Sequence, residues 1–378
     1  TAAVIPGRPV RPRRPWPVLA VVLALAVLAA ACGGDEDSAD SAADQDSASA
    51  SVSASAPADT DSGDEADGTT DDSTTEETGG DPEAEPEIFV VEHAVGTSEV
   101  PTGAETILAL DENAAFILWE LGLDPEVVYG SYLTVYTSLV ADDRGVEIVP
   151  HSLSAPSIEA SAALAPDVII GTDHPATIDA YDLWGEVGPT VLFPYREPWE
   201  VHLETVASAF GLDDLAAERT ANLQADIERV AAEIDAAFET PPTVSIVFAL
   251  GGAPFALPDM LTATADLLDE LGLDRPAAQR VDVDEAFPFV SFSAETLTDH
   301  DADFVIVASG GIYEDMSELP LFPSLTGTAV MAEGEYWLAA SHPFAISWIL
   351  ADIEAVVLDG GEPRSGADTL AHWTEYLG

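Results

Sequence analysis

One long amphipathic helix divides the folded part of this sequence and limits the folds open to it. From Asp213 to Ala237 apolar residues recur at helical spacing, and acidic residues occupy the other faces. Its apolar face comprises Leu223, Ile227, Val230 and Ile234. At about 1.5 Å per residue the helix would span about 37 Å, roughly the height of a small domain. Pro241 and Pro242 end the helix. We expect a helix of this length to connect two folded parts.

Apolar runs of strand type alternate with helical stretches on both sides of this helix. The predicted strands are 106–110, 127–129, 167–170, 191–193, 244–248 and 304–307. Alternation of this kind predicts an α/β fold, here with two similar lobes, each with a central, mostly parallel sheet, joined by the one long helix. We expect an N-terminal lobe at 88–212, the interlobe helix at 213–240 and a C-terminal lobe at 241–378.

Two short patterns occur once in each half of the folded part. The pentapeptide Glu-Leu-Gly-Leu-Asp stands at 120–124 and again at 270–274. Glu159 precedes Asp167 by eight positions and Glu295 precedes Asp303 by eight, each time before an apolar strand. Chance similarity is the alternative, but the shared order favours two related lobes.

The N-terminus has the organisation of an export signal. Four arginines between positions 8 and 14 precede the apolar run Trp16–Ala31, and the only cysteine, Cys32, follows at once. The apolar run is shorter than the about 20 residues of a spanning helix. Residues 28–32 resemble a bacterial lipobox, although Ala29 stands where leucine is usual. We predict a signal peptide at 1–32, lipidation of Cys32 and anchoring to the outer face of the cell membrane; a retained membrane helix is the alternative.

The tract after Cys32 is acidic and polar. Residues 33–87 consist largely of Asp, Ser, Ala, Glu, Thr and Gly, and contain no basic or aromatic residue. Such a composition predicts a disordered linker. The whole chain has 11 Lys+Arg, all of them arginine, against 70 Asp+Glu, for a formal net charge of −59. We therefore expect no nucleic-acid partner, because phosphate binding needs a basic surface.

Several segments together resemble a known family of transport proteins. They are 104–113, 120–123, 157–170, 199–212, the long helix and 337–353. In this order they resemble the substrate-binding proteins of iron–siderophore and cobalamin ABC importers, whose lobes are linked by a rigid helix. The resemblance implies capture of a ferric siderophore or similar chelate between the lobes, with little closure, and delivery to an ABC permease and its ATPase. A cobalamin or haem ligand remains an alternative.

Candidate ligand groups are polar and aromatic residues expected in loops after strands. They are Tyr132, Tyr136, His174, Tyr195, Arg196, Trp199, Phe255, Phe287, Phe289, Tyr313 and His342. Arg196 is the foremost of these, since an arginine beside aromatic rings suits an anionic or aromatic chelate. A surface ion pair with Glu197 or Glu200 is the alternative for Arg196.

The resemblance also implies one acidic docking residue on each lobe. Glu159 and Glu295 occupy the positions whose counterparts in the family meet arginines of the permease. The alternative is that each is a glutamate of a first helical turn, favoured there by the helix dipole.

Catalytic and metal-binding motifs are absent from the sequence. It contains no Gly-x-Ser-x-Gly, Walker or His-Glu-x-x-His pattern, and its seven histidines are scattered. We therefore expect no enzyme, no cofactor and a monomer. A zinc- or manganese-binding importer component, and an adhesion module on a stalk, remain the alternatives.

Overall fold

The computed structural model describes residues 87–378 except 131–133, 151–155, 260–261, 284–287 and 340. The predicted signal peptide with Cys32, the linker up to residue 86, Tyr132 and Phe287 lie outside the described residues. No helix in the described part has both the length and the apolar character needed to cross a bilayer. Residues 85–378 form one compact unit.

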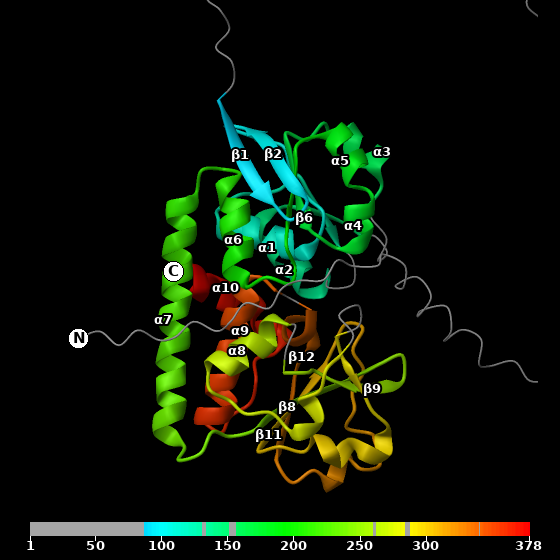
Figure 1. Cartoon of the computed structure of the whole chain (residues 1–378), viewed down its shortest axis with the longest axis vertical. Helices are drawn as coiled ribbons and strands as arrows, with labels where there is room; N and C mark the ends of the chain where they lie inside the picture. Colours follow the sequence, from blue (N-terminus) through cyan, green and yellow to red (C-terminus); the bar gives the residue numbers. More distant parts are fainter. Residues whose placement is uncertain (1–86, 131–133, 151–155, 260–261, 284–287, 340) are drawn as a thin grey trace, which may run out of the picture. The chain divides into compact units, whose positions relative to one another are not determined.

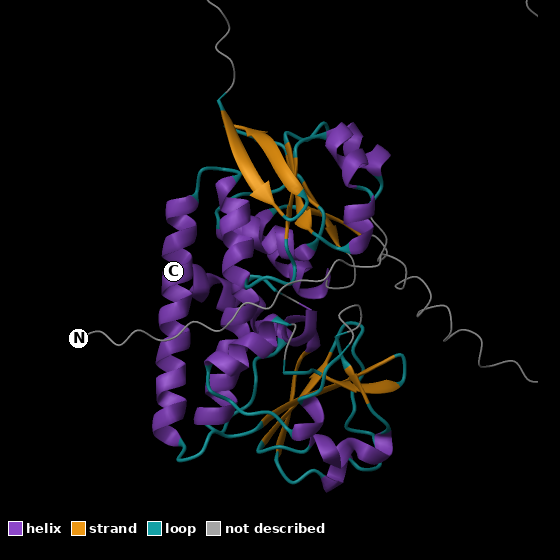
Figure 2. Cartoon of the chain, in the orientation of Figure 1, coloured by secondary structure: helices purple, strands orange, loops and turns teal. Residues whose placement is uncertain are grey.

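The first lobe is built on a five-stranded, wholly parallel sheet (Figures 1 and 2). Its strand order is β5-β4-β3-β6-β7, with β3 at Ile107–Ala109, β4 at Val127–Gly130, β5 at Glu147–Pro150, β6 at Val168–Thr172 and β7 at Thr190–Phe193. The helices of this lobe are α1 (Glu112–Glu120), α2 (Thr134–Arg144), α3 (Ile158–Ala163), α4 (Pro175–Asp179), α5 (Tyr181–Val187) and α6 (Trp199–Ser208). The central strands are buried on both faces, as their continuous apolar sequences require.

An antiparallel hairpin precedes this sheet, and the sequence did not predict it. It pairs β1 (Ile88–His93) with β2 (Gly96–Pro101). Val91 and Val100 are fully buried in the core of the first lobe, whereas Val90 is 64% exposed. The hairpin therefore covers the lobe with one face, while its other face, which includes Ile88 and Val90, is exposed to solvent.

The long helix α7 runs from Asp213 to Ala237, as predicted, over 25 residues. Its buried side chains are Ala216, Leu223, Ile227, Val230 and Ile234. Ala216 belongs to the core of the first lobe and the other four belong to the core of the second. The helix thus packs against both lobes, contacting α6 of the first lobe as well as α8 and α9 (Figure 1).

The second lobe repeats the α/β plan around a mixed sheet. Its order is β10-β9-β8-β11-β12, with β8 at Val244–Leu250, β9 at Ala253–Ala256, β10 at Val290–Ser291, β11 at Phe304–Ser309 and β12 at Thr328–Glu333. Strands β8, β11 and β12 are parallel, and β9 and β10 are antiparallel. Its helical elements are α8 (Ala263–Glu270), η1 (Ala277–Gln279), η2 (Ala294–His300), η3 (Phe322–Ser324), the π-helix η4 (Glu335–Ala339), α9 (Pro343–Ile353), η5 (Glu354–Leu358), η6 (Gly366–Asp368) and α10 (Thr369–Leu377).

The repeated pentapeptide forms the same helix end in both lobes. Gly122 follows α1 with φ +79°, and Gly272 follows α8 with φ +70°. In each case the next amide closes back on the helix, from Leu123 to Leu118 O at 2.9 Å and from Leu273 to Leu268 O at 3.0 Å. Glycine is required there because the left-handed conformation strains other residues.

The second repeated pattern also has a structural cause. Asp167 accepts hydrogen bonds from the amides of Glu105 and Thr106, at 3.0 and 2.9 Å, just before β3. Asp303 accepts from the amide of Thr243 at 2.8 Å, just before β8. Each aspartate therefore fastens the start of one central strand to the start of its neighbour, so the two lobes share this feature of construction.

The C-terminal helix α10 lies against the first lobe, although we expected residues 241–378 to form one lobe. It contacts α2, and Trp373 joins the core of the first lobe. The Tyr376 hydroxyl donates to Oε1 of Glu120 at 2.5 Å, and Arg219 of α7 donates to the carbonyl of Leu377 at 3.0 Å. The chain thus returns across both lobes before it ends.

Glu120 gives this contact a pH dependence. Burial raises its pKa from 4.5 to about 7, and the Tyr376 hydrogen bond and the Arg219 charge oppose the shift. Because the folded pKa is the higher one, the folded state binds the extra proton, and this contribution to stability is lost as pH rises through about 7.

We expect Glu120→Gln to raise the unfolding temperature relative to wild type more at pH 8 than at pH 5, in thermal melts. The exposed Glu126→Gln is the control; the same offset at both pH values would contradict the assignment.

Candidate functional site

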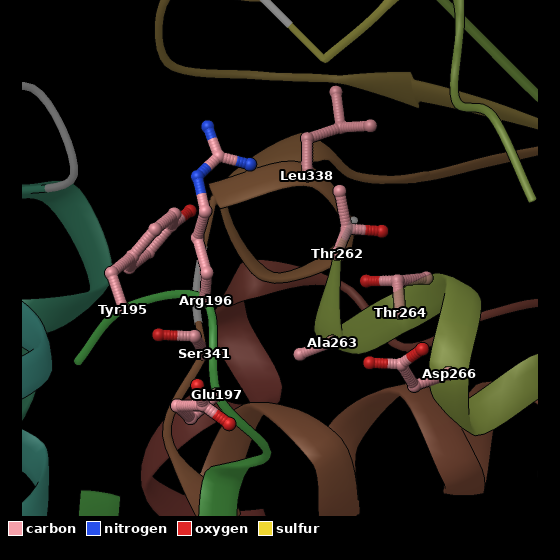
Figure 3. Close-up of a pocket in the computed structure, with 9 residues that line it drawn as sticks. All are labelled: Tyr195, Arg196, Glu197, Thr262, Ala263, Thr264, Asp266, Leu338 and Ser341. Atoms are coloured by element: carbon pink, nitrogen blue, oxygen red, sulfur yellow. The ribbon is translucent and has the colours of Figure 1, made fainter. Parts of the chain in front are cut away.

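The loop after β7, the start of α8 and the segment after β12 line a pocket between the two lobes (Figure 3). The empty space inside it, open solvent included, is about 370 Å³. We call it the Arg196 pocket; its lining is Tyr195, Arg196, Glu197, Thr262, Ala263, Thr264, Asp266, Leu338 and Ser341. Ligands of open α/β sheets bind at this edge, so the location is a candidate site.

Tyr195 is held in place from both lobes. Its amide donates to Oδ1 of Asp173 at 2.8 Å, and its hydroxyl donates to the carbonyl of Ala339 at 3.3 Å. The ring of His174 lies 5.0 Å from the Tyr195 ring, centroid to centroid. The structure therefore brings together three predicted residues, Tyr195, Arg196 and His174, in adjacent loops.

Arg196 extends into the Arg196 pocket in the direction of Leu338. Figure 3 shows its guanidinium pointing away from the carboxylates of Glu197 and Asp266. Arg144, Arg229, Arg280 and Arg364 all form ion pairs with acidic side chains elsewhere. Among the described residues that line the pocket, Arg196 is the only basic one, and a guanidinium can bond the oxygen atoms of a chelate.

A second pocket lies between the lobes, and like the Arg196 pocket it is lined in part by residues within 335–342. The empty space inside it, open solvent included, is about 240 Å³, and it is lined by Glu112, Asn113, Phe116, Tyr136, Thr137, Glu335, Tyr336 and His342. We call it the Glu335 pocket. Tyr136 stacks on Tyr336 at 5.2 Å and donates a hydrogen bond to Glu333. Burial and the acceptor Glu333 raise the pKa of Tyr136, so this phenol stays protonated.

His342 is committed to structure although it lines the Glu335 pocket. Its ring stacks on Phe116 at 4.3 Å, and its Nδ1 accepts from the amide of Ala345 at 3.2 Å, capping α9. Burial lowers its pKa to about 3, so the ring is neutral at physiological pH. His342 therefore contributes an apolar ring face rather than a charge.

Side chains of the first lobe hold the segment between η4 and α9. Oδ1 of Asn113 accepts from the amide of Ser341 at 2.9 Å. The buried His202 ring lies between the carbonyl oxygens of Ser341, at 2.9 Å, and Pro194, at 2.7 Å. The sequence analysis missed Asn113, His202 and Glu335, because nothing local distinguishes a polar residue that is buried by the other lobe.

Of the remaining predicted ligand residues, those that the structure describes line neither pocket. Trp199 is 5% exposed and packs in the core at the start of α6. Phe255, Phe289 and Tyr313 surround Phe248 in the second lobe, with ring centroids 4.9 to 5.6 Å from it. Tyr132 and Phe287 are not among the described residues.

The predicted docking residues are both exposed at the start of a short helical segment. Glu159 lies in the first turn of α3 and Glu295 in the first turn of η2. A serine, Ser157 or Ser293, stands two positions before each. A hydrogen bond to its own backbone amide and one from Ser293 lower the pKa of Glu295, so it is ionised at neutral pH.

The described residues contain no group of three His, Cys, Asp or Glu side chains placed to hold a metal ion. The scattered histidines have structural contacts instead. His300, for example, packs on Phe292 and lies 3.3 Å from the amide nitrogen of Gln279.

One protein family matches most of the folded part. The family described as periplasmic binding protein matches residues 107–328, more than half of the chain. No curated protein sequence matches the chain.

Solved structures of the same architecture align with nearly their whole length. Staphylococcus aureus SirA complexed with staphyloferrin B has a TM-score of 0.60 and 17% identity, over 71% of this chain and 98% of SirA. The petrobactin-binding protein YclQ of Bacillus subtilis has a TM-score of 0.59 and 18% identity, over 70% and 96%. The catecholate-siderophore binding protein VctP of Vibrio cholerae has a TM-score of 0.58 and 15% identity, over 71% and 100%. At such identities the likeness shows a common fold.

Proposed function

Because the chain belongs to the periplasmic binding protein family, we propose that its folded part captures a ferric siderophore between its lobes and delivers it to an ABC permease. The observation that carries the proposal is the Arg196 pocket, which combines one cation with the Tyr195 ring where the carboxyl ends of parallel strands meet. Ferric siderophores present oxygen atoms around the iron, and a guanidinium bonds such atoms while stacking on flat ligand groups.

The relatives support a chelate over the other ligands. SirA was solved in complex with staphyloferrin B, YclQ is named a petrobactin-binding protein and VctP a catecholate-siderophore binding protein. A bare zinc or manganese ion would need several converging ligands, and the described residues hold no such group. The protein therefore acts by binding and release, and the permease with its ATPase performs the transport.

Binding is testable by fluorescence quenching of the purified protein. Ferric hydroxamates, ferric catecholates, cobalamin, haem and Zn²⁺ form the panel, and we expect a ferric siderophore to bind most tightly. Arg196→Ala should weaken that binding by about 10-fold or more, since hydrogen bonds to charged groups contribute about 1.5–3 kcal/mol. Arg280→Ala, whose guanidinium pairs with Asp274, is the matched control. Quenching by Zn²⁺, cobalamin or haem alone would reject the siderophore proposal.

Glu159 and Glu295 are proposed to meet arginines of the permease. Three observations support this role. Both glutamates are exposed, one lies on each lobe, and each stands two positions after a serine at the start of a helical segment. Neither residue lines the Arg196 pocket or the Glu335 pocket, so docking and ligand binding are separable.

Charge reversal should uncouple uptake from binding. We expect the double variant Glu159→Arg, Glu295→Arg to bind ligand with wild-type affinity and to support little uptake, because repulsion replaces attraction at the docking surface. Uptake is measured in cells with the cognate importer at matched protein levels. The double variant Glu126→Arg, Glu239→Arg, at two other exposed positions, controls for the same change of net charge. Full uptake by the double variant would remove the docking role.

The proposed delivery also requires a protein held at the membrane. We propose lipidation of Cys32, which the basic–apolar–cysteine order of residues 8–32 supports. We expect metabolic labelling with a radioactive fatty acid to mark the wild type and not Cys32→Ser, and the variant to leave the membrane fraction once its signal is cleaved. An unlabelled wild type that retains residues 16–31 would contradict lipidation.

A further inference from the structure

Glu335 is a buried carboxylate without a hydrogen-bond partner. It opens the π-helix η4 and is 3% exposed. Neither of its oxygens accepts a hydrogen bond from the residues that the structure describes. A Cβ on Gly311 would collide with its Oε1, so the carboxylate lies closely against that glycine. Single-turn π-helices often occur at functional sites, and an unpaired buried carboxylate calls for a specific explanation.

The other groups that face Glu335 add negative rather than positive charge. Burial and the charges of Glu112 on α1 and Glu333 at the end of β12 raise the pKa of Glu335 to about 7. The Tyr136 amide opposes the shift without reaching hydrogen-bond geometry. Among the described residues, no arginine lines the Glu335 pocket. This arrangement destabilises the empty protein and would be relieved by a cation.

Glu333 differs from Glu335 because both of its carboxylate oxygens accept hydrogen bonds from the protein. Its Oε1 accepts from the amide of Gly366 at 2.6 Å, and Oε2 accepts from the Tyr136 hydroxyl. The acidic pair is therefore asymmetric: one carboxylate is used by the fold, and the other is left for an additional group.

Aromatic rings complete the surroundings of a cation. Phe116, Tyr136 and Tyr336 line the same pocket, together with the neutral ring of His342. These rings stack on one another, Phe116 on His342 and Tyr136 on Tyr336, so they exclude water from the carboxylate, which strengthens its attraction for a positively charged group. A bare metal ion does not fit, since the described residues hold no group of three metal-binding side chains.

We propose that the ligand carries a cationic arm, a primary ammonium or similar group, that binds Glu335 in the Glu335 pocket. The inference rests on the proposed function and specifies its ligand class. The Arg196 pocket and the Glu335 pocket share the segment 335–342. Arg196 would bond the oxygen atoms around the iron, and Glu335 would bond the arm. Net anionic chelates such as ferric tris-catecholates are then disfavoured.

Two ferric chelates that differ in one charge test this. Ferrioxamine B has a neutral ferric hydroxamate centre and an ammonium arm, and in its N-acetyl derivative a neutral amide replaces the ammonium. We expect wild type to bind ferrioxamine B about 10-fold or more tightly than the acetylated form, by fluorescence quenching at pH 8. Glu335→Gln should abolish this preference, and Glu186→Gln, an exposed change of equal charge, should retain it.

The preference should also depend on pH. As pH falls from 8 to 6, Glu335 takes up a proton, so affinity for ferrioxamine B should fall while affinity for the acetylated form stays constant. The pKa values of Tyr136 and Tyr336 lie far above this range and that of His342 far below it, so these three neighbours do not titrate there. Thermal melts establish that Glu335→Gln is folded.

A small amine separates failure of this inference from failure of the proposed function. n-Pentylammonium should raise the unfolding temperature of wild type but not of Glu335→Gln, and n-pentanol should raise neither. Equal affinity for the two chelates, or preference for the acetylated one, overturns the cationic arm while siderophore binding stands. Binding of n-pentylammonium without any ferric chelate in the panel keeps the cation site and rejects the siderophore proposal. No binding of either kind rejects both.

Discussion

The structure depends on how the first lobe holds the backbone between η4 and α9. Asn113, Tyr195 and His202 contact the polar backbone atoms of residues 339 and 341, at 2.9 to 3.3 Å. Buried backbone groups must be paired, so these side chains hold the backbone of residues 339 and 341 against the first lobe. Both pockets are lined by this segment. The ties, with α7 packed along both lobes, favour ligand binding with little closure.

Much of the fold could be predicted because it follows from local pattern. The bounds of α7 were correct, since an unbroken helical period between clear end signals leaves little freedom. The repeated glycine and aspartate patterns were informative because each has one structural cause, a left-handed helix end at Gly122 and Gly272 and a strand tie at Asp167 and Asp303. The β1–β2 hairpin and the position of α10 could not be predicted, because both depend on contacts with residues far away in the sequence.

The candidate site could be predicted less well, for a related reason. We expected Tyr195, Arg196 and His174 at the edge of the sheet because each follows a strand in the sequence, and the structure has them there. The same rule failed to distinguish Trp199, which turns into the core, because sequence does not show which side of a loop faces inward. Glu335 gave no signal at all, since a glutamate in a sequence this acidic is assumed to face water.

The two sources of negative charge in this protein act over different distances. The formal net charge of −59 creates a surface field that attracts cations of every kind. Salt screens that field beyond about 8 Å at physiological ionic strength, so it contributes to encounter and little to selectivity. Glu335 is 3% exposed, and its interaction with a bound cation would be screened much less. Under the proposed function, discrimination between cationic and neutral chelates therefore arises from one buried carboxylate and persists in salt concentrations that remove the effect of the surface.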